Sequence, residues 1–377
     1  MTPTELAVPA VEGSGEPFLS SDGDRLWLSW LEPAGEEWAL RLAAIDAEVG
    51  EPTIIVQRDD FFVNWADFPS VTALDDGRLA AHWLQRGGSG TYDYGVRVAW
   101  SDDGVEWSEP WTPHEDGTPT EHGFVSTLPQ GSDLGLLWLD GRRYVDGPEG
   151  EATGEMTLRY RSAAGPTSAG PETVVDGRIC DCCQTGSART TDGWVVVYRD
   201  RSEDEIRDIY AARLVDGEWT EGRPVHRDGW HIEGCPVNGP AVAAEGDRVA
   251  VGWFTGAADQ PRVHLAFSED QGITFGEPVR IDGGDPVGRV DVVMDGDGAR
   301  ISWIETVGGS AELRMRRVTE AGVAEPPVVV ATVSGARAAG FPQMVRHRGD
   351  LVFAWTDAVG DDTRVRVARW SRAGDDR

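Results

Sequence analysis

The sequence predicts an all-β protein, a seven-bladed β-propeller of four-stranded blades. The first observation is a phrase that repeats seven times: a strand, a Gly turn, a second strand that ends on an aromatic residue, and two more strands. The second is the spacing of the copies, about 50–60 residues, which suits one blade with its loops. The closing aromatic residues are Trp30, Trp83, Trp138, Tyr198, Trp253, Trp303 and Trp355.

No shift in composition divides the chain, so we expect residues 1–377 to form a single propeller domain. Second strands are short apolar runs after turns rich in Asp and Gly, as in 248–253, whereas third strands alternate, as Val263, Leu265 and Phe267 do. Fourth strands follow a charged residue beside Pro. These pairs lie at 51–52, 109–110, 171–172, 223–224, 277–278 and 325–326.

The seventh repeat runs out at Trp370 without a fourth strand. The N-terminal stretch 5–9 has the missing pattern. We therefore expect the N-terminal strand to complete the last blade and close the ring, because closure hides edge strands that an open array would expose.

Two turns between third and fourth strands share a motif: 268–275 has the sequence SEDQGITF, and 101–107 has the shorter SDDGVEW. In such a turn, Ser and Asp side chains accept hydrogen bonds from turn amides, Gly takes a positive φ and the aromatic residue packs beneath. The motif and the blade phrase resemble the Asp-box (BNR repeat) propellers of the sialidase superfamily. This resemblance covers nearly the whole chain.

The resemblance implies a propeller fold, with the six-bladed sialidase propeller as the alternative blade count. Sialidases carry an Arg in an aromatic-Arg-Ile-Pro motif on the first inner strand, and a Tyr nucleophile supported by Glu. The matching stretch here, 14–19, has Pro17 but no Arg. Tyr210 and Glu233 are available, but no motif fixes them. The sequence therefore argues against sialidase activity, since a fold does not carry a function across such departures.

The net charge is −31, and every basic residue apart from His is Arg, so a lysine Schiff base is excluded. So acidic a surface disfavours nucleic acid and anionic membranes as partners. No apolar run is long enough to span a membrane. No signal peptide is visible at Met1. We expect a monomeric exported protein, secreted or periplasmic, whose leader has been removed.

The four cysteines, Cys180, Cys182, Cys183 and Cys235, lie just before the first strands of the fourth and fifth blades. First strands line the central channel of a propeller, and adjacent blades are neighbours there. We therefore expect the thiols to gather at the channel mouth, with His231 nearby as a further donor.

Three interpretations of the cysteines stay open. Thiolates and an imidazole suit copper or zinc. Disulfides would instead staple blades four and five in an exported protein. A strained vicinal pair, Cys182 and Cys183, would be redox-active.

The second set of candidates serves carbohydrate chemistry. Arg199 and Arg201, in the loop after the second strand of blade four, would clamp an anionic group, although alternating charge there equally fits a surface ion-pair network. Trp65, Trp111 and Trp230 fall outside the blade phrase and are candidates for stacking on a sugar. The available acids and bases are Asp67, Glu121, His122, His231 and Glu233.

Our leading hypothesis from the sequence is a metal- or thiol-dependent site at the channel mouth. It would use Cys180, Cys182, Cys183, Cys235 and His231, with copper or zinc as the ion. The alternatives are an exo-glycosidase or lyase that acts on an anionic glycan, and a propeller that binds a glycan or a protein without catalysis. For catalysis the candidates are Asp67, His122, Arg199, Arg201 and Glu233.

Overall fold

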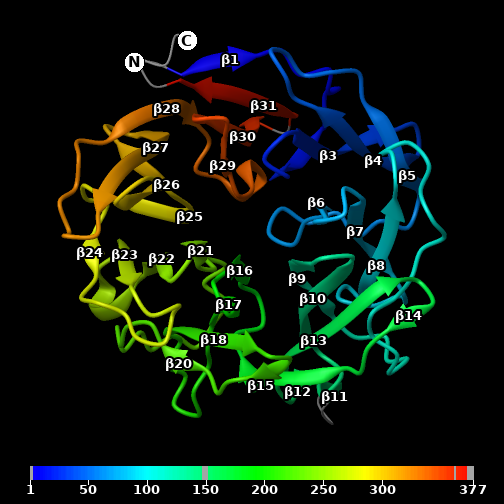
Figure 1. The fold of residues 1–377 in the computed structure, drawn as a ribbon, viewed down its shortest axis with the longest axis horizontal. Coiled ribbons are helices and arrows are strands. Elements are labelled where there is room, and N and C mark those ends of the chain that lie inside the picture. Colours follow the sequence, from blue (N-terminus) through cyan, green and yellow to red (C-terminus); the bar gives the residue numbers. More distant parts are fainter. Residues whose placement is uncertain (1–2, 147–151, 361, 372–377) are drawn as a thin grey trace.

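Seven antiparallel sheets stand around a central axis in the computed structural model, which describes residues 3–146, 152–360 and 362–371 (Figure 1). Each sheet is one blade, and its strands follow the chain from the axis outward, except that the outermost strand of the last blade comes from the N-terminal end of the chain. The prediction of a seven-bladed propeller is confirmed, and the six-bladed alternative is wrong. In the described residues, no helix is long and apolar enough to cross a membrane.

The first three blades hold strands β2 to β15. Blade 1 contains β2 (Gly15–Ser21), β3 (Leu26–Ala34), β4 (Glu37–Ala44) and β5 (Thr53–Arg58). Blade 2 contains β6 (Ser70–Ala73), β7 (Leu79–Arg86) and β8 (Tyr94–Ser101). Blade 3 contains β9 (His122–Gln130), β10 (Asp133–Asp140), β13 (Met156–Gly165), β14 (Ser168–Ala169) and β15 (Thr173–Ile179), with the small pair β11 (Val145–Asp146) and β12 (Ala152–Thr153) beside it.

The other four blades complete the ring. Blade 4 contains β16 (Gly186–Arg189), β17 (Gly193–Arg199), β18 (Ile209–Val215), β19 (Glu218–Trp219) and β20 (Arg223–Pro224). Blade 5 contains β21 (Ala241–Glu245), β22 (Arg248–Thr255), β23 (Arg262–Ser268) and β24 (Val279–Arg280), with the short helix η1 (Ala257–Asp259). Blade 6 contains β25 (Pro286–Met294), β26 (Gly298–Val307), β27 (Ser310–Thr319) and β28 (Val328–Val333). Blade 7 contains β29 (Gln343–His347), β30 (Asp350–Val359) and β31 (Asp362–Trp370), preceded by η2 (Arg337–Ala339).

The N-terminal strand β1 (Thr4–Leu6) closes the ring. It pairs antiparallel with β31, so that Thr4 faces Arg369 and Leu6 faces Val367, and the first and last strands of the chain lie side by side (Figure 1). β1 is the fourth strand that blade 7 lacks, as the sequence predicts. Closure gives the outer edge of β31 a hydrogen-bonded partner.

Blade 2 departs from the four-stranded pattern. Its fourth strand is reduced to one bridge, in which the backbone groups of Val98 and Trp111 exchange two hydrogen bonds of 2.8 Å. The turn before this bridge has the predicted hydrogen bonds: the Asp103 carboxylate accepts the amides of Val105 and Glu106 at 2.8 and 2.9 Å. The blade is therefore thin on its outer side.

The closing aromatic residues of the second strands form the packing between blades. All seven are at most 5% exposed. They lie in hydrophobic clusters that join neighbouring blades, as Trp83 does between blades 1 and 2 and Trp303 between blades 5 and 6. The periodic aromatic residues are therefore structural, and a ligand site has to use residues outside this repeat.

Candidate functional site at the channel mouth

The inner strands β2, β6, β9, β16, β21, β25 and β29 surround a cavity of about 260 Å³ on the axis, to which all seven blades contribute. Gln184 closes one end of it. Its side-chain amide donates to the Ala66 carbonyl of the segment before β6 and accepts the Gly239 amide, at 3.2 Å, from the segment before β21. The segments that precede the first strands thus meet across the axis, and this end is the channel mouth.

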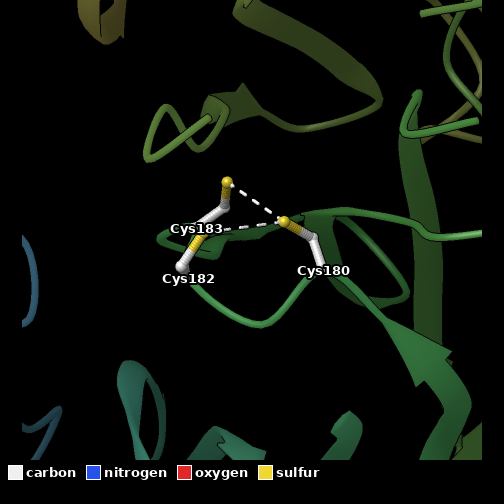
Figure 2. A group of neighbouring side chains, drawn as sticks. All are labelled: Cys180, Cys182 and Cys183. Carbon is white, nitrogen blue, oxygen red and sulfur yellow. Dashed lines mark hydrogen bonds between the residues drawn. The ribbon is translucent and has the colours of Figure 1, made fainter. Parts of the chain in front are cut away.

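Three cysteines from one short turn before β16 meet at this mouth (Figure 2). The Sγ atom of Cys180 lies 3.5 Å from that of Cys183 and 4.0 Å from that of Cys182. All four cysteines of the chain carry free thiols, and the described residues therefore contain no disulfide. Tetrahedral zinc, with Zn–S of about 2.3 Å, sets its sulfur atoms about 3.8 Å apart. The observed spacing fits such a centre.

The electrostatics of these thiols favour a thiolate. Hydrogen bonding with the Cys182 and Cys183 thiols holds the pKa of Cys180 well below its usual range, and the positive charges of Arg199 and Arg207 act in the same direction. Arg207 also donates to the Cys180 Sγ atom over 3.3 Å. The pKa values of Cys182 and Cys183 are raised in turn, by the hydrogen bond to Cys180 and by burial respectively.

Cys235, from the segment before β21, lies beside this turn. A thiol hydrogen bond from Cys182 lowers the pKa of Cys235, although the Cys235 Sγ atom lies outside the tight three-thiol group. His231 is exposed, and only its backbone is held, by a bridge to Ile206. Glu233 is exposed as well. Cys235 is therefore the donor nearest to completing a fourth position, whereas His231 lies outside the group.

Arg199 and Arg201 do not present free guanidinium groups to the mouth. Arg199 is 2% exposed and donates four hydrogen bonds to backbone carbonyls, of which two go to Asn238. Arg201 pairs with Glu205 at 2.8 Å and with Asp181 at 3.3 Å. The predicted anion clamp is thus replaced by a backbone anchor and by the ion-pair network that alternating charge also predicted.

The candidate acid Asp67 belongs to a chain of hydrogen bonds that the sequence did not predict. The Tyr94 hydroxyl lies 2.7 Å from Oδ2 of Asp67 and 2.8 Å from Oε1 of Glu121, and the other Asp67 oxygen accepts the Phe124 amide at 2.7 Å. Gly123 makes this approach possible, because a Cβ atom there would lie 1.9 Å from the Asp67 carboxylate.

This carboxyl–phenol–carboxyl chain shares protons. A phenol has one proton to donate, so with two carboxyl contacts one carboxyl group has to carry a proton of its own. Burial raises the pKa of Asp67 to about 7 and that of Glu121 to about 8. The negative charges of Asp181 and Cys235 raise the pKa of Glu121 further, so the chain ends close to the thiol cluster. Groups that exchange protons near neutral pH are suited to acid–base chemistry.

His122 lies in a different cluster, between blades 2 and 3. Its ring is fully buried and stacks on His114 with centroids 3.9 Å apart. Its Nδ1–H donates to the Thr120 carbonyl at 2.8 Å, and its Nε2 lies 3.2 Å from Asp116 and 3.6 Å from Asp140. The structure therefore places His122 apart from the thiols, among neighbouring ionic groups.

The three aromatic residues that the sequence suggests for stacking on a sugar lie in different surroundings. Trp230 is 9% exposed and lies under the Arg199 guanidinium, and Trp111 packs beside Trp100. Only Trp65 is a half-buried residue of the mouth, where it stacks on Phe341. The Arg289 and Arg337 guanidinium groups also lie over the Trp65 ring, 5.1 and 5.9 Å from its centroid, so Trp65 too already has packing partners.

Two residues of the mouth, Tyr94 and Arg207, were missed by sequence reasoning. Tyr94 opens a third strand, and loops between second and third strands return to the mouth face, so this rule could have found it. Arg207 lies in the charged loop 198–210, where nothing in the sequence separates the Arg that faces a thiol from those that pair with carboxylates.

Comparison with known proteins supports the fold. No protein-family model matches the sequence, and no curated protein matches it. Among solved structures, a polysaccharide lyase, an ulvan lyase bound to -[GlcA(1-4)Rha3S]-, superposes with a TM-score of 0.59 at 13% identity, covering 96% of this chain and 95% of that one. A leech intramolecular trans-sialidase gives 0.54 at 10% identity, covering 92% and 83%.

A protein of unknown function from Dyadobacter fermentans gives a TM-score of 0.50 at 15% identity, and the superposition covers 97% of both chains. This chain has the fold of sialidase-like and polysaccharide lyase propellers. At these identities the similarity establishes the architecture, and the chemistry has to be argued from the site.

Proposed function

We propose that this propeller binds one soft metal ion, copper(I) or zinc, through thiolates at its channel mouth. The observation that carries the proposal is the three-thiol group of Cys180, Cys182 and Cys183, with sulfur atoms 3.5 and 4.0 Å apart and no disulfide among them. A donor set made only of sulfur selects soft metals over calcium or magnesium. Cys235 is the proposed fourth ligand, and Arg207 would offset the negative charge of the thiolates.

Elemental analysis by plasma mass spectrometry tests this proposal. The protein would be purified without tag, chelator or reductant. We expect close to one copper or zinc per chain, and at least a ten-fold loss of bound metal in Cys183→Ser. Wild-type protein that stays free of metal after incubation with copper(I) or zinc, followed by desalting, would refute the proposal.

Two further variants identify the fourth ligand. Cys235→Ser should weaken metal binding, because it removes the donor nearest to the three-thiol group, whereas His231→Gln should leave it unchanged. The opposite result would return His231 to the ligand set that the sequence predicts.

We propose, as a second candidate function, acid–base cleavage of an anionic saccharide at the same mouth. The specific observation in its favour is the proton-sharing chain of Asp67, Tyr94 and Glu121, whose carboxyl groups have pKa values near neutrality. The similar folds of a lyase and a trans-sialidase support a carbohydrate ligand without identifying it. In this function Tyr94 would transfer the proton, and the two carboxyl groups would set its direction.

A panel of uronate-containing and sialylated polysaccharides tests this second function. Lyase products absorb in the ultraviolet, and hydrolase products carry new reducing ends. Tyr94→Phe should lower the rate by about 10²–10⁴-fold, the usual contribution of a general acid or base. Activity that persists in Tyr94→Phe, or no activity on any member of the panel, would contradict the proposal that the Asp67, Tyr94 and Glu121 side chains catalyse this cleavage.

A further inference from the structure

Four blades contain the same ion pair at the end of the second strand; its acid is buried in three of them, whereas the pair of blade 7 is partly exposed. The closing Trp is followed two residues later by an acid, and an Arg lies opposite the Trp on the third strand. The sets are Trp30, Glu32 and Arg41; Trp138, Asp140 and Arg159; Trp303, Glu305 and Arg314; and Trp355, Asp357 and Arg366. The Arg–acid distances are 2.7, 3.6, 3.3 and 3.4 Å.

The acid also accepts the indole N–H group in three of these blades. The distances are 2.8 Å for Trp30 to Glu32, 2.8 Å for Trp138 to Asp140 and 2.9 Å for Trp303 to Glu305. One carboxylate thus satisfies a buried indole and a guanidinium together, which explains why the three residue types recur in register.

Blade 2 keeps the Trp and the Arg but lacks the acid. Trp83 faces Arg97 across the strands, and the residue two positions after Trp83 is Gln85. Gln85 turns to Asp60 instead, to which its amide donates at 2.9 Å. Within the described ranges the indole N–H of Trp83 has no partner, and no carboxylate oxygen lies within 4.0 Å of the Arg97 guanidinium.

The Arg97 guanidinium lines a hollow of about 430 Å³ between blades 2 and 3. Its Nη1 group donates to Thr112 Oγ1 at 2.8 Å and to the Val96 carbonyl at 3.2 Å. Its other donors make no hydrogen bond within the part of the chain that the structure describes. The hydroxyl-bearing residues Thr118 and Thr120 line the same hollow. A volume of this size suits a small ligand.

The acidic residues around the hollow already have cationic partners. Glu115 pairs with Arg161 at 2.9 Å, and Asp116 lies 3.4 Å from Arg142. His114 accepts the Val96 amide at its Nε2, so the proton of the neutral ring is on Nδ1, and burial lowers the pKa of this ring. Asp60 also attracts Arg97, but it pairs with Arg58. In the described residues Arg97 is therefore a cation of the hollow that has no carboxylate oxygen within ion-pair distance, in a protein whose net charge is −31.

We propose that this hollow binds the oxyanion group, a carboxylate or a sulfate, of a small hydroxylated ligand, and that this group pairs with Arg97 as an acid side chain pairs with the corresponding Arg in four other blades. The ligand oxyanion gives Arg97 the negative partner that an acid side chain provides in those blades. The Thr118 hydroxyl donates to Asp116 and pairs with that of Thr120, so the two oxygens accept hydrogen bonds from the hydroxyl groups of the ligand. This site lies off the axis and needs neither a metal nor turnover, so it goes beyond both candidate functions.

The test is binding of D-glucuronate to the whole protein, measured by calorimetry and by saturation-transfer NMR. D-Glucose is the neutral comparison, and inorganic sulfate is the competitor. We expect glucuronate to bind at least ten-fold more tightly than glucose. Displacement by sulfate would show that the site accepts either oxyanion, and failure of sulfate to compete would show a carboxylate site; both results support an oxyanion site.

Two variants should weaken the site by different changes. Arg97→Gln removes the cation, and Gln85→Glu restores the acid that the other blades have; each should weaken glucuronate binding at least ten-fold. Their matched controls, Arg189→Gln and Gln130→Glu, make the same charge changes away from the hollow and should stay within two-fold. Gln85→Glu keeps the side-chain length and adds an acceptor for the Trp83 indole, although it exchanges the hydrogen bond to Asp60 for a contact between two carboxylates. It gives a second test of the site where Arg97→Gln fails to fold.

Three results would overturn the proposal: no binding of glucuronate by the wild-type protein, equal affinity for glucose, or unchanged affinity in both Arg97→Gln and Gln85→Glu. The Glu121→Gln variant separates this site from the catalytic proposal. It should retain glucuronate binding even though it removes one end of the proton-sharing chain.

Discussion

Two clusters of metal-type donors lie close to the mouth face, and they differ in whether their lone pairs are already in use. The thiol cluster, before β16, has three Sγ atoms that contact one another, Arg207 and the thiol of Cys235. The imidazole cluster, His114, Asp116 and His122, has donor atoms equally close together. In the imidazole cluster, however, the ring nitrogens and the carboxylate already contact backbone groups, hydroxyls and Arg142.

The difference shows that proximity alone does not make a metal site. His114 can release its Nε2 only by losing the Val96 amide, and Asp116 is held by the Thr118 hydroxyl and backbone amide. The imidazole cluster therefore has a structural role, because its buried hydrogen bonds and ion pairs connect blades 2 and 3. The thiols have no comparable partner, and a soft cation would satisfy all of them.

The largest expected effect separates the two clusters by metal content. Cys180→Ser should lower bound copper or zinc at least ten-fold, since it removes the thiolate at the centre of the cluster. His122→Gln should leave the metal content unchanged, because His122 already donates to Thr120 and faces two carboxylates. Plasma mass spectrometry on both variants checks this. A parallel loss of metal in His122→Gln would move the metal to the imidazole cluster.

The stability of the His122→Gln variant tests the structural role of the imidazole cluster. His122→Gln should destabilise the fold by about 2–3 kcal/mol, because it removes a buried stacked ring and changes the environment of two carboxylates. Urea unfolding followed by tryptophan fluorescence measures this. A change below about 0.5 kcal/mol would mean that the imidazole cluster has no structural role, since surface substitutions give values of that size.

Opposite pH dependences form the third comparison. The folded state keeps the proton of Asp67 up to about pH 7, whereas an unfolded Asp releases it near pH 4, so the folded state binds more protons in this window. Stability should then fall as pH rises from about 4 to 7, by up to about 1.4 kcal/mol per pH unit for this group. Urea unfolding across this range should show a flatter profile for Asp67→Asn.

Asp116 should act in the reverse direction. Hydrogen bonds from His114 and Thr118 lower its pKa, outweighing the effect of its burial, so its contribution is present above the pKa of an unfolded Asp and is lost as the pH falls below it. Asp116→Asn should therefore be relatively more stable in acid than the wild type. Both variants are compared with the wild type by the pH dependence of their stability. If Asp67→Asn and Asp116→Asn shift this dependence in the same direction, the assignment of opposite pKa shifts to the two carboxyl groups is contradicted.

The smallest effect tests the hydroxyl that supports Asp116. Thr118→Val removes its hydrogen bonds to Asp116 and Thr120 and should reduce stability by about 1 kcal/mol. Thr332→Val, at an exposed position of β28, is the matched control and should change stability by less than about 0.5 kcal/mol. Equal effects at the two positions would show that the Thr118 hydroxyl contributes nothing specific.

The sequence by itself determined the architecture and the place of the cysteines. Seven aromatic-closed repeats predict seven blades, and the missing fourth strand after Trp370 predicts the closure by β1. Position before a first strand was enough to bring Cys180, Cys182 and Cys183 to the mouth. These features follow from local patterns, because strand alternation and repeat spacing are fixed along the chain.

Only the tertiary structure decided which polar groups meet. Asp67, Tyr94 and Glu121 come from three segments whose side chains converge only when blades 2 and 3 pack together. The loss of a partner for Arg97 depends on a cross-strand register that brings it opposite Trp83, two residues from Gln85. The backbone anchor that takes Arg199 from the mouth depends on Asn238 of the next blade. Such pairings join distant residues, and composition or periodicity along the chain does not encode them.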